Sequence, residues 1–331
     1  MRILVVGGTG FIGKHVVTEL SNLGHQVTVY HRGNSEPRLP FGVEHVHGAL
    51  ATRPVLEFPA ELTALALDVV LGMHVMGERD ARAVVQAFRG IARRLVLLSS
   101  GDVYRAYGVV SGSDAGPVEP GPLKEDSPLR QALYPYRAAA PSREDWRSDY
   151  EKILAERVVS AEAVLPATIL RLPAVYGPED EYHRFGAWVG KMAQGSPRIL
   201  LSEREASWRW THGYVENVAH AIVLAVTSER AKRKIYNVGE RAAPTMIERA
   251  RSLARVAGWA GEIVAVPAEE LPPEERRPGN FAQDILYDTS RIRADLDYEE
   301  GVPEEEGLRR TIAWERFVLS PLSPEESRGE T

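Results

Sequence analysis

A glycine-rich turn near the start of the chain constrains its fold more than any other feature. Residues 3–6 of the predicted strand at 2–6 are apolar, and Gly7, Gly10 and Gly13 follow at a spacing of three. Apolar residues then recur at helical spacing up to Leu23, and residues 26–30 indicate a second strand. A glycine turn between a buried parallel strand and a helix presents backbone N–H groups that bind a pyrophosphate. The first thirty residues therefore predict a complete βαβ unit that binds a dinucleotide.

The turn itself supplies most of the predicted cofactor contacts. The alternative is a tight turn that binds no ligand. The glycine motif lies inside a whole βαβ unit at the N-terminus, and this context argues against that alternative. The residues that we expect to line the dinucleotide here are Gly7, Thr9, Gly10, Phe11, Ile12 and Gly13.

Strand and helix patterns alternate through the first half of the chain. Apolar strands near 43–46, 67–71 and 94–99 flank a helical pattern at 80–88. This alternation predicts right-handed crossovers and a parallel sheet covered on both faces. The expected fold class is α/β: a doubly wound parallel sheet of the Rossmann type with a smaller C-terminal cap domain. We expect the dinucleotide-binding domain at 1–172, with 215–239 returning to it. Residues 173–322 are expected to form mainly a substrate-binding cap, and 323–331 a flexible tail.

Composition narrows the class of protein. A chain of 331 residues that is 44% hydrophobic and 26% charged is ordinary for a globular protein with a large core. It has no cysteine, which excludes disulfides and zinc–sulfur sites, and His183 and His212 lack a metal-ligand spacing, so no metal is expected. The net charge of −6 argues against nucleic-acid binding. Without a long apolar run or a leader, we expect a cytoplasmic protein that does not bind membranes.

The end of the second strand bears on which dinucleotide is bound. In such folds an acidic residue about 20 positions past the glycines bonds the adenosine ribose, whereas an arginine there accepts a 2′-phosphate. This strand ends Tyr30-His31-Arg32-Gly33, and no acidic residue occurs before Glu36. The planar, permanently charged side chain of Arg32 suits phosphate, although a solvated arginine at a strand end is the alternative. The sequence favours NADP, with NAD as the second candidate.

Five segments together carry a family resemblance. They are GGTGFIG at 7–13, SSGDVY at 99–104, KILAE at 152–156, LRLPAVYGP at 170–178 and YNVG at 236–239. Over nearly its whole length the chain resembles an atypical extended short-chain dehydrogenase/reductase of the NAD-dependent epimerase/dehydratase family. The resemblance implies hydride transfer between NAD(P) and a hydroxyl or carbonyl group of a nucleotide sugar or similar small molecule. Epimerase, dehydratase and reductase activities stay open, because one fold hosts many chemistries. Whether the chain forms a homodimer is left open by the sequence.

The resemblance also implies site residues. Ser100 holds the position that polarises the substrate oxygen, and Lys152 holds that of the lysine that bonds the ribose and lowers the pKa of a catalytic tyrosine. Ser99, Pro173 and Val175 are further expected cofactor contacts. The family's tyrosine stands four residues before the lysine, where this chain has Ser148. This departure is the main one.

Tyr150 is the tyrosine nearest in sequence to Lys152. On a regular helix over 142–164, residues two apart point about 200° from each other, which predicts Tyr150 in the core and Ser148 beside the ribose. The remaining alternatives are another proton donor (Tyr104, Tyr136 or Asp102), or Tyr150 reaching the site from a distorted helix start. A third alternative is a cofactor-binding protein with little catalysis, such as a sensor or an RNA-associated factor. The catalytic candidates are therefore Ser100, Lys152 and Tyr150.

Overall fold

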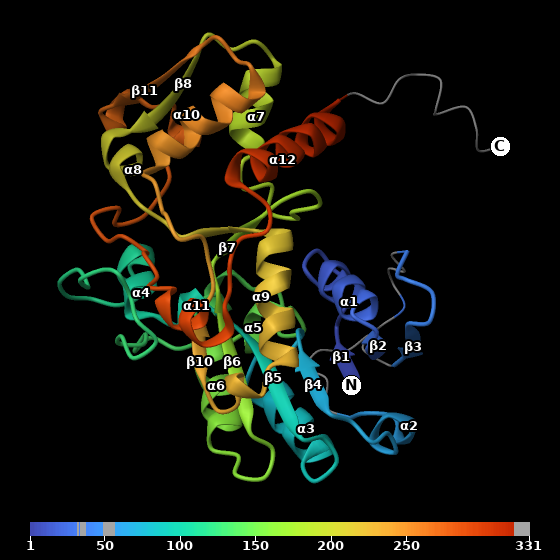
Figure 1. Ribbon diagram of the computed structural model, residues 1–331. Coiled ribbons are helices and arrows are strands. Elements are labelled where there is room, and N and C mark those ends of the chain that lie inside the picture. Colours follow the sequence, from blue (N-terminus) through green and yellow to red (C-terminus); the bar gives the residue numbers. More distant parts are fainter. Residues whose placement is uncertain (32, 34–37, 49–56, 321–331) are drawn as a thin grey trace. The chain divides into compact units, whose positions relative to one another are not determined.

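A computed structural model describes residues 1–31, 33, 38–48 and 57–320 (Figure 1). The chain divides into two compact units. The first, called here the sheet unit, comprises Met1–Val175, Arg209–Ala243 and Pro278–Gly301. The second comprises Tyr176–Trp208, Pro244–Arg277 and the chain from Val302 onward. Arg32 and the predicted tail lie outside the described residues.

The sheet unit is built on seven parallel strands in the order β10-β6-β5-β4-β1-β2-β3. The predicted doubly wound parallel sheet is confirmed. Chain order reverses between β1 and β4, which creates the switch point where ligands of open α/β sheets bind. The strands are β1 (Arg2–Val6), β2 (Gln26–His31), β3 (Glu44–His47), β4 (Val69–Gly72), β5 (Arg94–Ser100), β6 (Ala167–Leu172) and β10 (Ile235–Asn237).

Helices cover both faces of this sheet. On one face Leu4 and Val6 belong to the same buried cluster as Val84 of α3 and Val159 of α6. On the other face α1 packs against α9. Alternate side chains of each buried strand therefore reach a covered, apolar layer, which explains why these strands are apolar throughout. The helices of this unit are α1 (Gly13–Asn22), α2 (Ala60–Thr63), α3 (Glu78–Phe88), α4 (Arg105–Ser111), α5 (Trp146–Asp149), α6 (Lys152–Ser160), α9 (Val215–Thr227) and α11 (Ser290–Leu296).

One segment belongs to a different unit from the one predicted. Residues 278–301, expected within the cap, lie in the sheet unit. Isolated β-bridges join Tyr287 to Leu123 and Ile285 to Trp210, and Ile292 of α11 is fully buried. These contacts connect positions far apart in the sequence, so local patterns give no sign of them.

The second unit is smaller. Its strands β8 (Arg198–Ser202) and β11 (Glu262–Val266) pair in parallel. Its helices are α7 (Gly186–Ala193), α8 (Glu203–Ser207), α10 (Met246–Ala257) and α12 (Glu304–Leu319), and α10 packs against both α7 and α12. Short strands β7 (Ala174–Tyr176) and β9 (His212–Tyr214) form a separate pair. No helix in the described ranges is long and apolar enough to cross a membrane.

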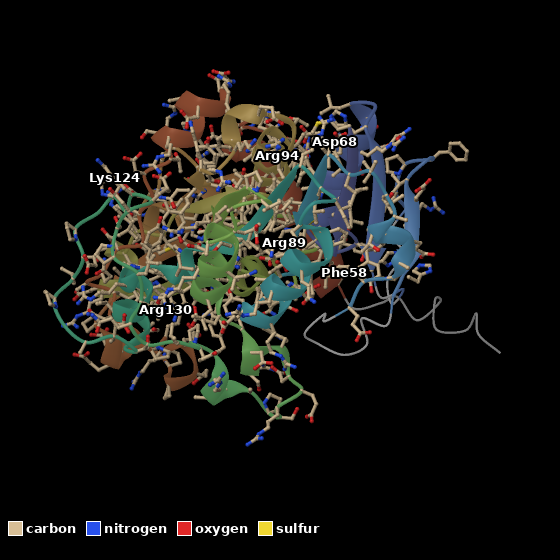
Figure 2. All side chains as sticks on the ribbon, turned by 90° about the horizontal axis from the view of Figure 1, so that it is seen from below. Phe58, Asp68, Arg89, Arg94, Lys124 and Arg130 are labelled. Carbon is tan, nitrogen blue, oxygen red and sulfur yellow. The ribbon has the colours of Figure 1, made fainter. Side chains whose placement is uncertain are left out.

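Arg94, labelled in Figure 2, ties the start of β5 to the end of α9. Its side chain is 1% exposed. Nη1 donates to the carbonyls of Ala225 (3.2 Å) and Ser228 (2.8 Å), and Nη2 donates to that of Val226. Carbonyls in a last helical turn have no intrahelical donor. This guanidinium supplies donors to them inside the fold.

We predict that Arg94→Met lowers the free energy of unfolding by about 3 kcal/mol, because it leaves buried carbonyls without donors. Arg93→Met is the matched control, since the neighbouring Arg93 side chain is 81% exposed and only faces Asp68. The control should change stability by less than about 0.5 kcal/mol. Denaturant unfolding of both variants measures the difference. Equal stabilities would show that Arg94 does not hold the end of α9.

Candidate active site

The glycine turn has the geometry of a phosphate cradle. Gly7 has φ +88°, and a Cβ placed on it would lie 2.6 Å from the Cβ of His74. A Cβ on Gly13 would lie 2.6 Å from the backbone of Gly8. Both positions therefore require glycine. Beside Gly10 the described residues leave open space within 4 Å.

Helix α1 begins at Gly13, three residues after Gly10. Its N-cap residue is Ile12, and no side chain of the described residues caps the helix. Uncapped N–H groups at a helix N-terminus bind anions, so the turn fits a dinucleotide pyrophosphate. Thr9, Phe11 and Ile12 are half-buried along the same turn. Their contacts with a cofactor stay a prediction.

The helix predicted over 142–164 is wrong, and the difference falls at Tyr150. Helix α5 ends at Asp149 and α6 begins at Lys152. Between them Tyr150 (φ −66°, ψ 115°) and Glu151 (φ −159°, ψ 95°) are extended. Tyr150 and Lys152 are therefore not two positions of one regular helix, and the angle of about 200° between such positions does not separate them. Tyr150 and Lys152 come to the same side, with Nζ of Lys152 5.7 Å from the centroid of the Tyr150 ring.

The hydroxyl of Tyr150 lies at the end of β5. It donates to Oδ2 of Asp102 at 2.8 Å, and Tyr136 donates to the same oxygen at 2.9 Å. The other carboxylate oxygen, Oδ1, is buried and has no hydrogen-bond partner among the described residues. Ser100 is adjacent, because its Oγ accepts from the backbone N–H of Asp102 at 3.2 Å. Tyr150, Ser100 and Asp102 thus form one cluster.

Burial controls the protonation of this cluster. It raises the pKa of Tyr150 well above 10, an effect that Asp102 increases and a hydrogen bond with Ser100 opposes. Burial likewise raises the pKa of Asp102, against the hydrogen bonds from the tyrosines and the positive charge of Arg130. The phenol is therefore held protonated beside a carboxylate that accepts a proton more readily than usual.

A buried ion pair holds the segment that carries Tyr150. Nη2 of Arg130 lies 3.1 Å from Oε1 of Glu151, and both side chains are 0% exposed. Arg130, labelled in Figure 2, also donates from Nε to the carbonyl of Asp102. Glu151 caps α6 by accepting from the N–H of Ile153 at 2.9 Å. One guanidinium thus joins the turn after Ser100 to the residue that follows Tyr150.

Lys152 is buried beside Tyr150. Nζ donates to the carbonyls of Val75 (2.6 Å) and Leu98 (3.0 Å), which leaves a third N–H for a ligand. Burial lowers the pKa of Lys152 to about 8, although the carboxylates of Asp102 and Asp80 raise it.

Other predicted residues have different surroundings. Ser99 donates to Oε1 of Glu156 at 2.5 Å inside the fold, and Tyr104 donates to Asn237 at 2.6 Å. The hydroxyl of Ser148 donates to the carbonyl of Ser142 at 2.7 Å, so it does not lie against Lys152 in the way that the helix prediction requires.

Two predicted cofactor contacts lie just after β6. Pro173 packs between two glycines of the sheet unit: a Cβ on Gly213 would lie 3.0 Å from its ring, and one on Gly239 would lie 3.5 Å from it. Val175 is buried in β7. Their roles toward a cofactor stay predictions.

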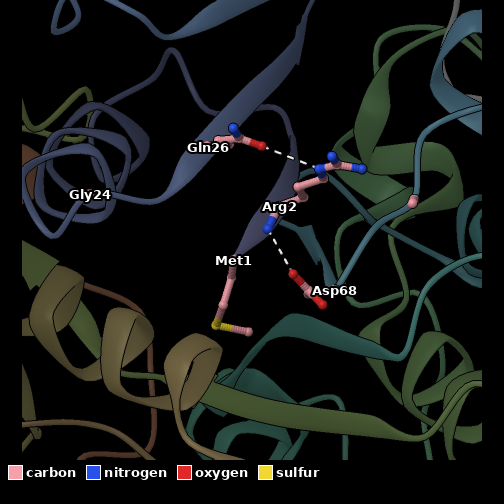
Figure 3. A pocket seen from close by; sticks show the side chains of 6 residues that line it. Met1, Arg2, Gly24, Gln26 and Asp68 are labelled. Carbon is pink, nitrogen blue, oxygen red and sulfur yellow. Dashed lines mark hydrogen bonds between the residues drawn. The ribbon is translucent and has the colours of Figure 1, made fainter.

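A hollow of about 470 Å³ lies at the amino ends of the strands, lined by Met1, Arg2, Gly24, Gln26, Ala66 and Asp68 (Figure 3). There Arg2 bonds the side chains of Gln26 and Asp68. The glycine turn and the tyrosine cluster occupy the opposite, carboxyl edge of the sheet, where ligands of such folds bind. The hollow is therefore not the candidate site.

Residues 3–239 match the model of the NAD dependent epimerase/dehydratase family. UDP-N-acetyl-alpha-D-glucosaminuronate decarboxylase from Bacillus cytotoxicus is 24% identical and aligns with 96% of this chain and 98% of its own. 2'-Dehydrokanamycin reductase from Streptomyces kanamyceticus is 27% identical over 81% of this chain and 70% of its own. The solved structure of Thermus thermophilus UDP-glucose 4-epimerase in complex with NAD is 25% identical, with a TM-score of 0.65 and coverages of 96% and 99%.

The titration of Lys152 tests the electrostatics of the cluster. The folded lysine has a pKa of about 8, whereas an ordinary lysine side chain in water has a pKa of 10.5. Burying the ammonium therefore disfavours the folded state below pH 8, and this penalty falls between pH 8 and 10.5. We predict that Asp102→Asn lowers the pKa of Lys152 further, because it removes a nearby negative charge. NMR titration of the lysine side chain measures it.

Asp149→Asn is the control for this titration, because Asp149 is half exposed and pairs with Arg79. It should leave the pKa of Lys152 unchanged. An unchanged pKa in Asp102→Asn would show that the two groups do not interact across the cluster.

Proposed function

The chain belongs to the NAD-dependent epimerase/dehydratase family, and from this premise we propose that it catalyses NAD(P)-dependent hydride transfer on a hydroxyl or carbonyl group. The observation that carries the proposal is the Tyr150 phenol, which bonds Asp102 next to Ser100 and has the Lys152 ammonium 5.7 Å from its ring centroid. The relatives above are a decarboxylase and an epimerase named for UDP-sugars and a reductase of an aminoglycoside derivative. These names support a nucleotide sugar or a similar hydroxylated molecule as the substrate.

The cluster supplies an acid and a base for the substrate oxygen. When bound, the nicotinamide supplies or accepts the hydride. The hydroxyls of Ser100 and Tyr150 hold the substrate oxygen, and Tyr150 exchanges the proton with it. In the oxidative direction the substrate hydroxyl gives its proton to the Tyr150 oxygen, while the phenolic proton passes to Oδ2 of Asp102 along their 2.8 Å hydrogen bond. The reductive direction reverses both transfers.

Asp102 suits this role because it is buried and accepts from two phenols. Burial raises its pKa, which narrows the gap in basicity between the carboxylate and the substrate's alkoxide. Tyr136 donates to Oδ2 of Asp102 and so holds it in place. The Tyr136 hydroxyl also lies 3.1 Å from the hydroxyl of the half-buried Tyr107, with which it shares a hydrogen bond. Lys152 adds a positive charge that favours the phenolate, and its third N–H suits a ribose hydroxyl.

The alternative of a cofactor-binding protein with little catalysis depends on the lack of a tyrosine at the site. The position of Tyr150 removes that argument, since a phenol is within reach of Ser100 without the usual spacing. The net charge of −6 also opposes an RNA-associated role. We assign recognition of the rest of the substrate to the second unit, and we propose a cytoplasmic location.

We predict that Tyr150→Phe lowers kcat by about 100- to 10,000-fold, because it removes the proton donor and keeps the ring. The dissociation constant for the dinucleotide should change less than about twofold, since the hydroxyl bonds protein groups rather than cofactor. Turnover is followed at the nicotinamide absorbance with UDP-glucose and UDP-glucuronate as trial substrates. Ser148→Ala is the control and should retain activity, because its hydroxyl bonds only a backbone carbonyl. The reverse pattern would assign proton transfer to Ser148 and remove Tyr150 from the mechanism.

The preference for NADP over NAD rests on Arg32 and on the absence of an acidic residue at 31–35. We predict that NADP binds at least about tenfold more tightly than NAD, because a guanidinium pairs with the 2′-phosphate. Isothermal titration measures both constants. Arg32→Asp should remove or reverse the preference, whereas Arg38→Asp, at a nearby position, should not. Equal affinities in the native chain would contradict the role of Arg32.

A further inference from the structure

Three histidines share one face at the edge of the parallel sheet. His31 ends β2 and lies opposite His47 of β3 in the strand register. His45 stands two residues before His47 on β3, and residues two apart on a strand point to the same face. Glu44, one position before His45, points to the other face, where it accepts a hydrogen bond from Thr28. The His-x-His pattern and the paired histidine therefore converge.

The imidazole rings are close enough to share one ion. Nε2 of His31 lies 2.9 Å from Nδ1 of His45, and the rings of His31 and His47 have centroids 4.6 Å apart. One ring nitrogen from each histidine lies within 4.8 Å of those of the others. His31 is 3% exposed, whereas His45 and His47 are exposed. One ligand is thus fixed in the fold, and two can adjust from the surface.

We propose that His31, His45 and His47 bind a divalent transition-metal ion of the zinc class, with water completing the coordination. Imidazole nitrogens bind zinc at about 2.0–2.1 Å, which places the ligand atoms of a tetrahedral site ~3.4 Å apart. The 2.9 Å between Nε2 of His31 and Nδ1 of His45 is close to that value, and all three ligand nitrogens lie within 4.8 Å of one another, so rotations of the two exposed rings complete the site. Neutral imidazoles select zinc, cobalt, nickel and copper over magnesium and calcium.

Metal binding requires one proton to move. The N–H of Gly33 donates to Nδ1 of His31 at 3.2 Å, so the neutral ring carries its proton on Nε2 and donates to His45. A metal at Nε2 needs that proton on Nδ1, and the Gly33 amide must then turn away. Gly33 lies in a left-handed turn (φ +79°) that glycine adopts without strain. The Gly33 amide is therefore a reporter of metal binding.

The ion links β3, at the edge of the sheet, to β2. Strand β3 is the last strand in the sheet order, and among the described strands it pairs only with β2. It is short and mostly exposed. An ion held by both strands adds a link where few buried contacts hold the edge. The site lies on β2 and β3, away from Tyr150, so the ion takes no part in the proposed proton transfer, although His31 directly precedes Arg32 in the sequence.

Titration of the full-length, chelator-treated chain with Co²⁺ tests the proposal, because a tetrahedral cobalt site has a strong visible spectrum. We expect one ion per chain with a dissociation constant below about 1 μM, and displacement by Zn²⁺. His45→Asn and His47→Asn should each weaken binding by at least about 100-fold, since loss of an outer-shell partner alone costs up to that much. Both side chains are exposed, so these variants should fold.

Glu44→Gln is the matched control, because this carboxylate stands on the same strand and faces away. It should leave the cobalt spectrum unchanged. In NMR spectra the Gly33 amide should shift when Zn²⁺ is added to the native chain and stay in place in His47→Asn.

Two results would overturn the proposal. One is binding that persists in the double variant His45→Asn/His47→Asn, which would place the ion elsewhere, such as at the terminal amine beside His25. The other is binding of the native chain only at millimolar Co²⁺, as expected of scattered surface histidines.

Discussion

The buried ion pair between Arg130 and Glu151 determines where the reactive side chains stand. Both side chains are fully buried, and the guanidinium also bonds the carbonyl of Asp102. A buried pair of this kind adds little net stability, but breaking it by removing one partner costs about 3–5 kcal/mol. The main effect of the Arg130–Glu151 pair is therefore on where the neighbouring segments lie. It fixes the turn that follows Ser100 against the chain between Tyr150 and Lys152.

This constraint explains how the chain places a phenol without the family's usual spacing. With Glu151 held as the N-cap, α6 begins at Lys152 and the two preceding residues are extended. An extended residue advances the chain about 3.3 Å, against 1.5 Å in a helix, so Tyr150 reaches the end of β5 from only two positions away. There its hydroxyl meets Asp102. The number of residues that separates two side chains meeting in the site therefore depends on where the helix begins, as well as on the helical repeat.

The features that sequence reasoning predicts here are those encoded locally. The glycine turn, the alternation of strands and helices, and the family resemblance follow from short segments, and the family match and the parallel sheet confirm them. Tyr150 is buried as predicted, but its hydroxyl lies against Asp102, and Ser148 does not lie beside Lys152. Both differences follow from the break between α5 and α6, which is held by Arg130, a residue that is distant in sequence and carries no motif.

The histidine cluster illustrates the same limit. His-Val-His at 45–47 is visible in the sequence, but its partner His31 is assigned only by the register of β2 and β3. Residues 278–301 likewise join the sheet unit through bridges to residues that local patterns do not connect. Pairing between distant segments decides each of these cases.

A crystal structure of the chain with its dinucleotide bound is the most direct test of this account. We predict that α6 begins at Lys152, with Glu151 paired to Arg130 and the Tyr150 hydroxyl bonded to Asp102 next to Ser100. A continuous helix from residue 146 to 160, with Ser148 one turn before Lys152 and Tyr150 turned into the core, would contradict it.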